Sequence, residues 1–236
     1  MKKKMLKLGK VSLGSGARIV LVIPGIKDFS IINKAKAEGA DILELRFDEW
    51  GNILIPEVVK TVKIIQKKGL PLIGTIRSIR EGAKKRFSEK QRLELFEAII
   101  PLVDAVDIEL SSELIRDKVI KRAKESKKKV IVSYHNFKNT PSDKSLRSII
   151  HKAKAKGADI VKIAALAKNQ DDIIRLLELT LDCRDKNLIT IAMGKKGAIS
   201  RVLFPLAGSL LTYSCIGKPL ASGQIPLDEL RRQLYK

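Results

Sequence analysis

One lysine lies where a charge is costly. Lys162 is flanked by Ile160, Val161 and Ile163 in a short β-branched run. Desolvation in apolar surroundings disfavours the ammonium form and lowers the pKa, which makes an amine nucleophilic near neutral pH. The sequence therefore predicts that Lys162 is a nucleophile. The alternative is an inert lysine held in an ion pair.

The chain has two histidines, and one of them ends a similar run. His135 follows Ser133 and Tyr134 at the end of residues 129–135, which makes it the candidate acid–base group. His151 lies in a lysine-rich helical phrase, and we expect it to be a solvated helix residue.

Further charges interrupt the apolar runs. They are Glu44, Arg46, Asp48, Arg77, Asp107 and Glu109. Strands buried on both faces should be almost continuously apolar, so charges within them are either paired or functional. Asp107 or Glu109 can be read as half of a buried ion pair that fixes the fold. Together with Lys162 and His135, the set predicts an anion-binding, acid–base site.

Eight β-branched runs must position these residues. They cover residues 18–24, 41–48, 71–78, 105–110, 129–135, 159–164, 188–194 and 210–216. Segments with apolar residues at helical spacing lie between them, as at Ile55, Val58, Val62 and Ile65. This alternation over 236 residues predicts an α/β fold, a single (β/α)₈ TIM barrel domain over residues 1–236. Active sites of this fold lie at the carboxyl ends of the strands, where the charges above fall.

An internal repeat relates the two halves of the chain. Residues 34–45 match residues 152–163 at eight of twelve places, which corresponds to an offset of 118. In an eight-stranded barrel this offset places Glu44 and Lys162 at equivalent positions on opposite walls, so we expect them to face each other. The other interpretation is that helix-Gly-Ala-Asp-strand is simply a good local αβ turn.

The charge of the chain is strongly positive. Lys plus Arg number 47 and Asp plus Glu 26, which gives a net charge of +21. Such a charge attracts nucleic acid, but aromatic residues make up 4% and the basic residues are spread along the chain beside Glu and Asp. We therefore expect no nucleic-acid partner.

Other compositional features bound the cellular setting. No apolar run approaches the roughly 18 residues needed to span a bilayer, and no apolar stretch of a secretory signal follows the basic start. We expect a cytoplasmic protein with no membrane partner. Cys183 and Cys215 have no metal-binding spacing, so we expect buried free thiols and no metal site.

Several motifs occur together along nearly the whole chain. Asp107-Ile-Glu-Leu110 is followed, after nineteen residues, by Val130-Ile-Val-Ser-Tyr-His-Asn136. The others are Glu44-Leu-Arg46-Phe-Asp48, Thr75-Ile-Arg77-Ser78 with Glu81-Gly82, Asp159-Ile-Val-Lys162-Ile-Ala164, Met193-Gly-Lys-Lys-Gly-Ala-Ile-Ser-Arg201 and Gly223-Gln224-Ile225. In this order they resemble the type I 3-dehydroquinate dehydratases of the shikimate pathway, which serves aromatic amino-acid biosynthesis. Enzymes of this family are lyases that react through a Schiff base.

The resemblance implies a role for each site residue. Lys162 would attack the ketone of 3-dehydroquinate, His135 would move the protons, and Glu81 would orient His135, with no cofactor. Glu44, Arg46 and Arg77 would hold the ring hydroxyls, and Arg201 with Gln224 the carboxylate. Phe137, Met193 and Tyr213 would supply apolar walls. The partner is then the small-molecule substrate, and a homodimer is left open.

One loop departs from the family pattern of a serine followed by Ala-Pro-Gly-Gln. In residues 217–225, Leu220 takes the serine place and Ser222 the proline place. Ser222 either replaces the missing hydroxyl at the site or leaves Leu220 to cover it. We expect closure through Gln224, with Leu220 as an apolar lid and Gly217 and Gly223 as hinges.

Two other functions share some of these features. A class I aldolase or transaldolase would also use a barrel lysine, and Gly194 and Gly197 are compatible with a phosphate loop, but the segment around His135 speaks against it. A basic nucleic-acid-binding protein would show binding that weakens steeply with salt.

Overall fold

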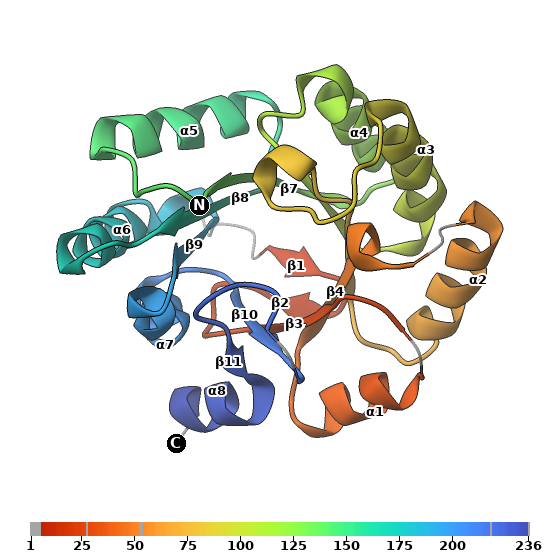
Figure 1. The fold of residues 1–236 in the computed structure, drawn as a ribbon, viewed down its shortest axis with the longest axis horizontal. Coiled ribbons are helices and arrows are strands. Elements are labelled where there is room, and N and C mark those ends of the chain that lie inside the picture. The colour runs from red at the N-terminus through yellow and green to blue at the C-terminus, as the bar shows by residue number, and fades with distance from the viewer. Residues whose placement is uncertain (1–5, 27, 52–53, 218, 236) are drawn as a thin grey trace.

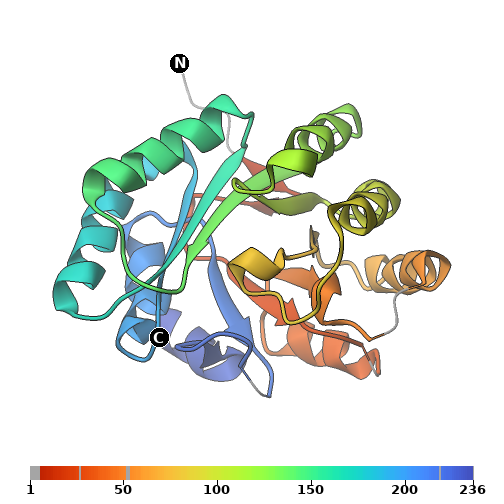
Figure 2. The same cartoon turned by 45° about the horizontal axis from the view of Figure 1, so that its top comes forward.

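In the computed structural model, which describes residues 6–26, 28–51, 54–217 and 219–235, strands and helices alternate around a barrel (Figure 1). The strands are β1 (Lys7–Leu8), β2 (Val11–Ser12), β3 (Ile19–Ile23), β4 (Ile42–Arg46), β5 (Leu72–Thr75), β6 (Ala105–Glu109), β7 (Lys129–Asn136), β8 (Ile160–Leu166), β9 (Leu188–Met193), β10 (Thr212–Cys215) and β11 (Ile225–Pro226). The α-helices are α1 (Ser30–Ala37), α2 (Ile55–Gln66), α3 (Glu89–Ile99), α4 (Glu113–Glu125), α5 (Asp143–Ala155), α6 (Gln170–Asp182), α7 (Ser200–Ala207) and α8 (Leu227–Leu234). Helices surround the strands on the outside (Figure 2).

The main sheet confirms the predicted barrel. Its order is β11-β10-β3-β4-β5-β6-β7-β8-β9, and each neighbouring pair is parallel. The eight predicted runs correspond to β3 through β10. Two features lie outside the predicted runs: β11, and the antiparallel hairpin of β1 and β2, which inserts Leu8 and Leu13 into the barrel interior. Residues 1–5 of the basic start lie outside the described residues.

The barrel closes at a seam where β9, the last strand of this order, lies beside β10. Among the described residues it is linked by the Leu210 N–H, which donates to the Leu188 carbonyl at 2.9 Å. Ser209 Oγ adds a side-chain link: it accepts from the Thr190 N–H at 3.1 Å and donates to the Leu211 carbonyl at 3.2 Å. The wall is therefore closed, but with few backbone hydrogen bonds at this point.

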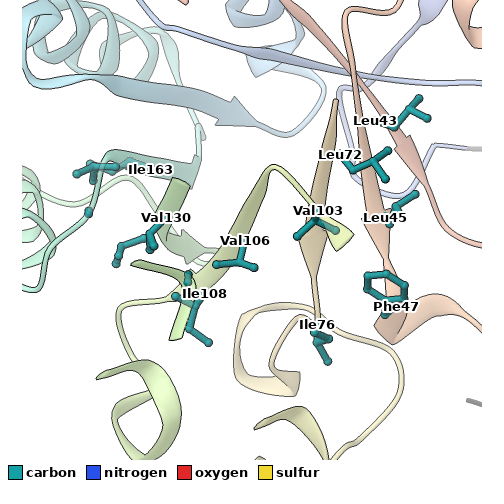
Figure 3. Close-up of a cluster of buried hydrophobic side chains, with 14 of the residues drawn as sticks. Leu43, Leu45, Phe47, Leu72, Ile76, Val103, Val106, Ile108, Val130 and Ile163 are labelled. Carbon is teal, nitrogen blue, oxygen red and sulfur yellow. The ribbon is translucent and has the colours of Figure 1, made fainter. Parts of the chain in front are cut away.

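Alternation along each strand sorts side chains between two cores. Leu43, Leu45, Val106, Ile108 and Ile163 point outward into the apolar layer under the helices (Figure 3). The intervening residues point inward, where Ile42, Ile73, Ala105, Ile131 and Ile160 form an apolar layer with the hairpin. Two residues further along, the inward positions become polar, because they hold Glu44, Thr75, Asp107, Ser133 and Lys162. A polar layer thus lies above an apolar one, toward the carboxyl ends of the strands.

Helix α3 has a well-defined start and packs closely against β5. A capping box starts this helix: Ser88 Oγ accepts from the Gln91 N–H, and the Gln91 side chain accepts from the Ser88 N–H. Gly74 lets α3 approach β5 closely, because a Cβ there would lie 2.6 Å from Ile99 Cδ1. This packing fixes the end of β5, from which Arg77 reaches the barrel interior.

Two smaller expectations can be compared with the structure. Cys183 and Cys215 are buried free thiols, as predicted. In the part of the chain that the structure describes, no helix has the length and apolar character needed to cross a membrane.

Candidate active site

A cleft opens at the carboxyl ends of the strands, enclosing about 700 Å³ of space including open solvent at its mouth. Of the residues predicted to catalyse or to bind substrate, Ser222 does not line it, and neither do the charged residues Asp48, Asp107 and Glu109. The cleft is also lined by residues that the sequence analysis did not assign: Val22, Glu49, Gly82, Lys84, Ala164, Ile191 and Ala221. The predicted site residues are therefore brought together from strands, from the turns that follow them and from α7, all far apart in the sequence.

Lys162 lies at the floor of the cleft and is 4% exposed. Its Nζ lies 2.9 Å from Asp107 Oδ2 and 3.3 Å from Glu44 Oε1, so Glu44 and Lys162 face each other as predicted. The expected lowering of its pKa is wrong. Burial alone would lower the pKa of Lys162, but the carboxylates of Asp107 and Glu44 outweigh burial and raise it. The amine is an ammonium in the free protein.

Asp107 forms the buried ion pair that the sequence left open, within a larger network. Arg77 lies 3.1 Å from Asp107 and 2.9 Å from Glu109, and donates to Ser133 Oγ at 2.8 Å. Burial would raise the pKa of Asp107, but Arg77 and Lys162 lower it well below its usual range. Both carboxylates of β6 are therefore ionised, and they hold Arg77 across the barrel interior.

Arg92 of α3 closes this network from outside the barrel. It is 1% exposed, and its guanidinium donates to Glu109, to Ser112 Oγ and to the carbonyl of Ile76, the residue before Arg77. The sequence analysis missed Arg92, because its place in an amphipathic helix does not show that it turns inward.

His135 is paired with Glu81, as predicted. Its Nδ1 and its backbone N–H both lie 2.9 Å from Glu81 Oε2, and Ser111 Oγ donates to the other carboxyl oxygen. Burial, with the nearby charges of Arg77 and Lys162, holds the pKa of His135 well below 6.5. The imidazole is thus neutral at pH 7, and donation from Nδ1 to Glu81 leaves Nε2 with a lone pair.

The pKa of Glu81 lies close to neutral pH. Burial raises its pKa to about 7, against the lowering effect of the Ser111 hydrogen bond and the Arg77 charge. The turn that carries it ends at Gly82, whose φ of +97° favours glycine and whose Cβ would lie 2.6 Å from the Phe137 ring. Phe137 in turn stacks near the His135 ring, with centroids 6.5 Å apart.

Arg201 differs from the other arginines of the cleft. Arg46 forms two hydrogen bonds to Asp48, and Arg77 is held by two carboxylates. Arg201 is 3% exposed, and its Nη1 donates to the Tyr213 carbonyl at 3.4 Å. Among the described residues its Nε has no partner, and burial lowers its pKa to about 10. A buried guanidinium that lacks a carboxylate is suited to bind an anionic ligand.

The loop after β10 distinguishes between the two alternatives for Ser222 and Leu220. Ser222 is exposed and does not line the cleft, whereas Leu220, Ala221 and Gln224 do. The Ser222 carbonyl accepts from the Gly194 N–H at 3.3 Å, which ties this backbone to the barrel while the side chain is turned to solvent. Gln224 Oε1 accepts from the N–H groups of Leu220 and Ala221, which leaves its amide NH₂ as a donor for a ligand. Lys218 of this loop lies outside the described residues.

Comparisons with known proteins agree with this geometry. A profile of the family described as type I 3-dehydroquinase matches residues 19–236. The chain is 38% identical to the 3-dehydroquinate dehydratase of Methanococcoides burtonii, over 98% of both chains, and 42% identical to that of Methanosarcina acetivorans, over 97% of this chain and 98% of the relative. The crystal structure of 3-dehydroquinate dehydratase from Geobacillus kaustophilus superposes with a TM-score of 0.90 at 32% identity, covering 98% of this chain and 95% of that one. The chain therefore belongs to the type I 3-dehydroquinase family, whose members are lyases.

Proposed function

We propose that this enzyme converts 3-dehydroquinate to 3-dehydroshikimate through an imine on Lys162, with His135 moving the protons. One observation carries the assignment: the buried amine of Lys162, the His135–Glu81 pair and the unpaired guanidinium of Arg201 line one cleft. A ketone that also bears a carboxylate has groups that match the amine and the guanidinium.

The raised pKa of Lys162 fits imine formation when the whole step is counted. An ammonium and a ketone give an iminium and water, because two of the three ammonium protons leave with the ketone oxygen. One positive charge therefore remains on Nζ, where Asp107 and Glu44 already stabilise it. The iminium then withdraws electrons from the adjacent carbon and makes its proton acidic.

His135 is suited to remove that proton. Its neutral imidazole holds Nε2 as a base while Glu81 fixes the ring through Nδ1. The imidazolium so formed would protonate the hydroxyl that leaves as water. Hydrolysis of the product imine then restores the Lys162 amine.

The remaining polar groups would hold the substrate. Arg201 and the amide NH₂ of Gln224 would bind the carboxylate, because both present donors into the cleft without a competing acid. Glu44, Arg46 and Arg77 would contact the ring hydroxyls. Phe137 and Met193 would exclude water from the imine.

Borohydride trapping tests the assignment directly. The enzyme mixed with 3-dehydroquinate and borohydride should carry an adduct that peptide mass mapping places on Lys162, and borohydride without substrate should give none. In parallel, the near-ultraviolet band of the conjugated enone product should appear when borohydride is omitted. An adduct on another lysine, or product without any adduct, would contradict the mechanism.

A second variant separates the role of His135 from that of Lys162. His135→Ala should still give the trapped adduct but should turn over about 10² to 10⁴ times more slowly, which is the usual contribution of a general acid–base group. His151→Ala is the matched control and should behave as wild type. Loss of trapping in His135→Ala would mean that the imidazole is needed earlier, to form the imine.

We also propose that two copies of the chain associate through α6 and α7. These packed helices expose Ile174, Leu181, Leu203 and Leu206, with Ile199 beside them, at 36–68% exposure. Neighbouring exposed apolar residues of this kind are typical of an interface, and two-fold dimers are the commonest oligomers. The free thiols of Cys183 and Cys215 fit a cytoplasmic enzyme.

Sedimentation velocity tests the dimer. Wild type should sediment as a dimer, and Leu206→Glu as a monomer. Leu114→Glu, at an exposed leucine of α4, is the control and should leave the dimer intact. A monomeric wild type at micromolar concentration would refute the interface.

A further inference from the structure

Two buried polar atoms of the cleft have no hydrogen-bond partner among the described residues: Arg201 Nε and Tyr213 Oη. The proposed function gives Arg201 a carboxylate to bind, whereas the family resemblance gives Tyr213 only the role of an apolar wall. A buried hydroxyl without a partner is unfavourable, because nothing replaces the water that it has lost. Such a hydroxyl, on a residue that lines a ligand cleft, indicates a ligand atom that it binds.

The place of Tyr213 narrows down which ligand atom this is. Its ring is 3% exposed, and Lys162 Nζ lies 4.1 Å from the ring centroid. Its backbone carbonyl accepts from Arg201 Nη1, so the residue lies between the amine and the anion-binding guanidinium. Lys162, Arg201 and Tyr213 line the same cleft, so a substrate that binds to both charged groups lies beside Tyr213.

The chemistry near Lys162 requires a hydrogen-bond donor. When an amine attacks a ketone, negative charge develops on the ketone oxygen. The ion-pair partners of Nζ are the carboxylates of Asp107 and Glu44, which accept hydrogen bonds but do not donate them when ionised. The Tyr213 side chain also lies against Nζ, and its hydroxyl can donate. Burial raises the pKa of the Tyr213 hydroxyl, so it keeps its proton and remains a donor.

We propose that Tyr213 is a further catalytic residue, whose hydroxyl donates a hydrogen bond to the ketone oxygen of the substrate while Lys162 attacks the carbonyl carbon. The inference rests on the proposed function. In this step the C–N bond forms, the π electrons of the C=O bond move to oxygen, and oxygen gains a proton that nitrogen loses. The C–O bond then breaks as the nitrogen lone pair forms the C=N bond, and the oxygen leaves as water with a second proton from nitrogen. Tyr213 can relay these protons and is unchanged at the end.

Tyr213→Phe tests the hydroxyl while it keeps the ring. In single-turnover reactions stopped with borohydride at increasing times, the adduct on Lys162 should form about a hundredfold more slowly than in wild type, as for loss of one oxyanion donor. Binding of the 3-hydroxy analogue of the substrate, which has no ketone, should change less than twofold. The melting temperature should be equal or higher, because the variant removes an unsatisfied buried group.

Tyr134→Phe is the matched control. Its hydroxyl accepts from Asn136 Nδ2 at 3.1 Å, and its ring packs on the outer core away from the cleft. This variant should trap the adduct at the wild-type rate.

The outcomes separate the two proposals. Equal trapping rates in wild type and Tyr213→Phe would overturn the role of the hydroxyl and leave the imine intact. Weaker binding of the 3-hydroxy analogue together with a lower melting temperature would assign Tyr213 to packing, and would also overturn it. No adduct in wild type would contradict the proposed function, and the inference would fall with it.

Discussion

Replacing Lys162 with alanine should destabilise the fold as well as remove the nucleophile. Had this lysine been unpaired, its removal would have been almost neutral, but it is paired with Asp107 and Glu44. The buried network holds three cations and three anions: Arg77, Arg92 and Lys162 against Glu44, Asp107 and Glu109. The variant changes its formal charge from zero to −1 in a site that water reaches poorly.

The expected loss follows from the contacts that remain. Breaking a buried ion pair by removing one partner costs about 3–5 kcal/mol. Arg77 still lies 3.1 Å from Asp107, so we expect the lower end of this range, about 3 kcal/mol. For a domain of this size, that corresponds to a fall in melting temperature of about 6–12 °C.

Urea unfolding at pH 7 measures the loss, and a double-mutant cycle identifies its cause. Asp107→Asn removes one anion, so the double variant Lys162→Ala/Asp107→Asn restores a neutral network. The double variant should therefore be more stable than the sum of the single effects predicts, by about 1–3 kcal/mol. Additive effects, or a Lys162→Ala protein as stable as wild type, would refute the charge-balance reasoning.

Three further predictions concern the rest of the cleft. The folded protein keeps the proton of Glu81 up to about pH 7, whereas the unfolded chain releases it near its ordinary pKa of 4.5. The free energy of unfolding should therefore fall as pH rises across this window, and Glu81→Gln, measured by urea unfolding at several pH values, should lose this slope; the same slope in the variant would assign the titration elsewhere. Arg201→Lys keeps the charge but loses the planar fork, so substrate should bind about 10–100 times more weakly in a direct binding assay, and equal affinity would show that the anion is held by other groups. Gln224→Ala should lower kcat/KM more than Ser222→Ala, because Gln224 lines the cleft and Ser222 does not; the reverse order would return the serine to the site.

The positions of the site residues could be predicted because strand geometry is regular. Inward and outward residues alternate, so Glu44, Asp107 and Lys162 had to point into the barrel once their runs were identified as strands. The half-chain offset then placed Glu44 opposite Lys162. Neither step needed knowledge of any contact.

The charge state of Lys162 could not be predicted in the same way. Its sequence neighbours Val161 and Ile163 point outward, and they suggested an apolar setting that lowers the pKa. The groups that decide the pKa, Asp107 and Glu44, come from strands 55 and 118 residues away. Burial, which lowers the pKa, can be inferred from the neighbouring residues in the sequence. The carboxylates that raise the pKa again are brought close only when the barrel is assembled.

For a related reason, the sequence could not decide between Ser222 and Leu220 in the loop after β10. The residue type of Ser222 is compatible with either alternative, whereas the direction of its side chain depends on the backbone. Its carbonyl is tied to the Gly194 N–H, and Gly223 follows with a φ of +84°. Neither this backbone hydrogen bond nor the backbone conformation at Gly223 can be read from the residue types of the loop.

Bound substrate should stabilise the seam between β9 and β10. Met193 ends β9 and Tyr213 lies in β10, so a molecule held between them bridges the two edges that share few backbone hydrogen bonds. Bound substrate then links β9 to β10 across the seam by contacts that the backbone does not supply. Any ligand that binds only the folded state at 100 times its Kd adds about 2.7 kcal/mol of stability. Here the gain should be concentrated locally, so that amide hydrogen exchange at Thr190 and Leu210 slows more than exchange at the continuous ladder of β3 and β4 on the opposite side of β10.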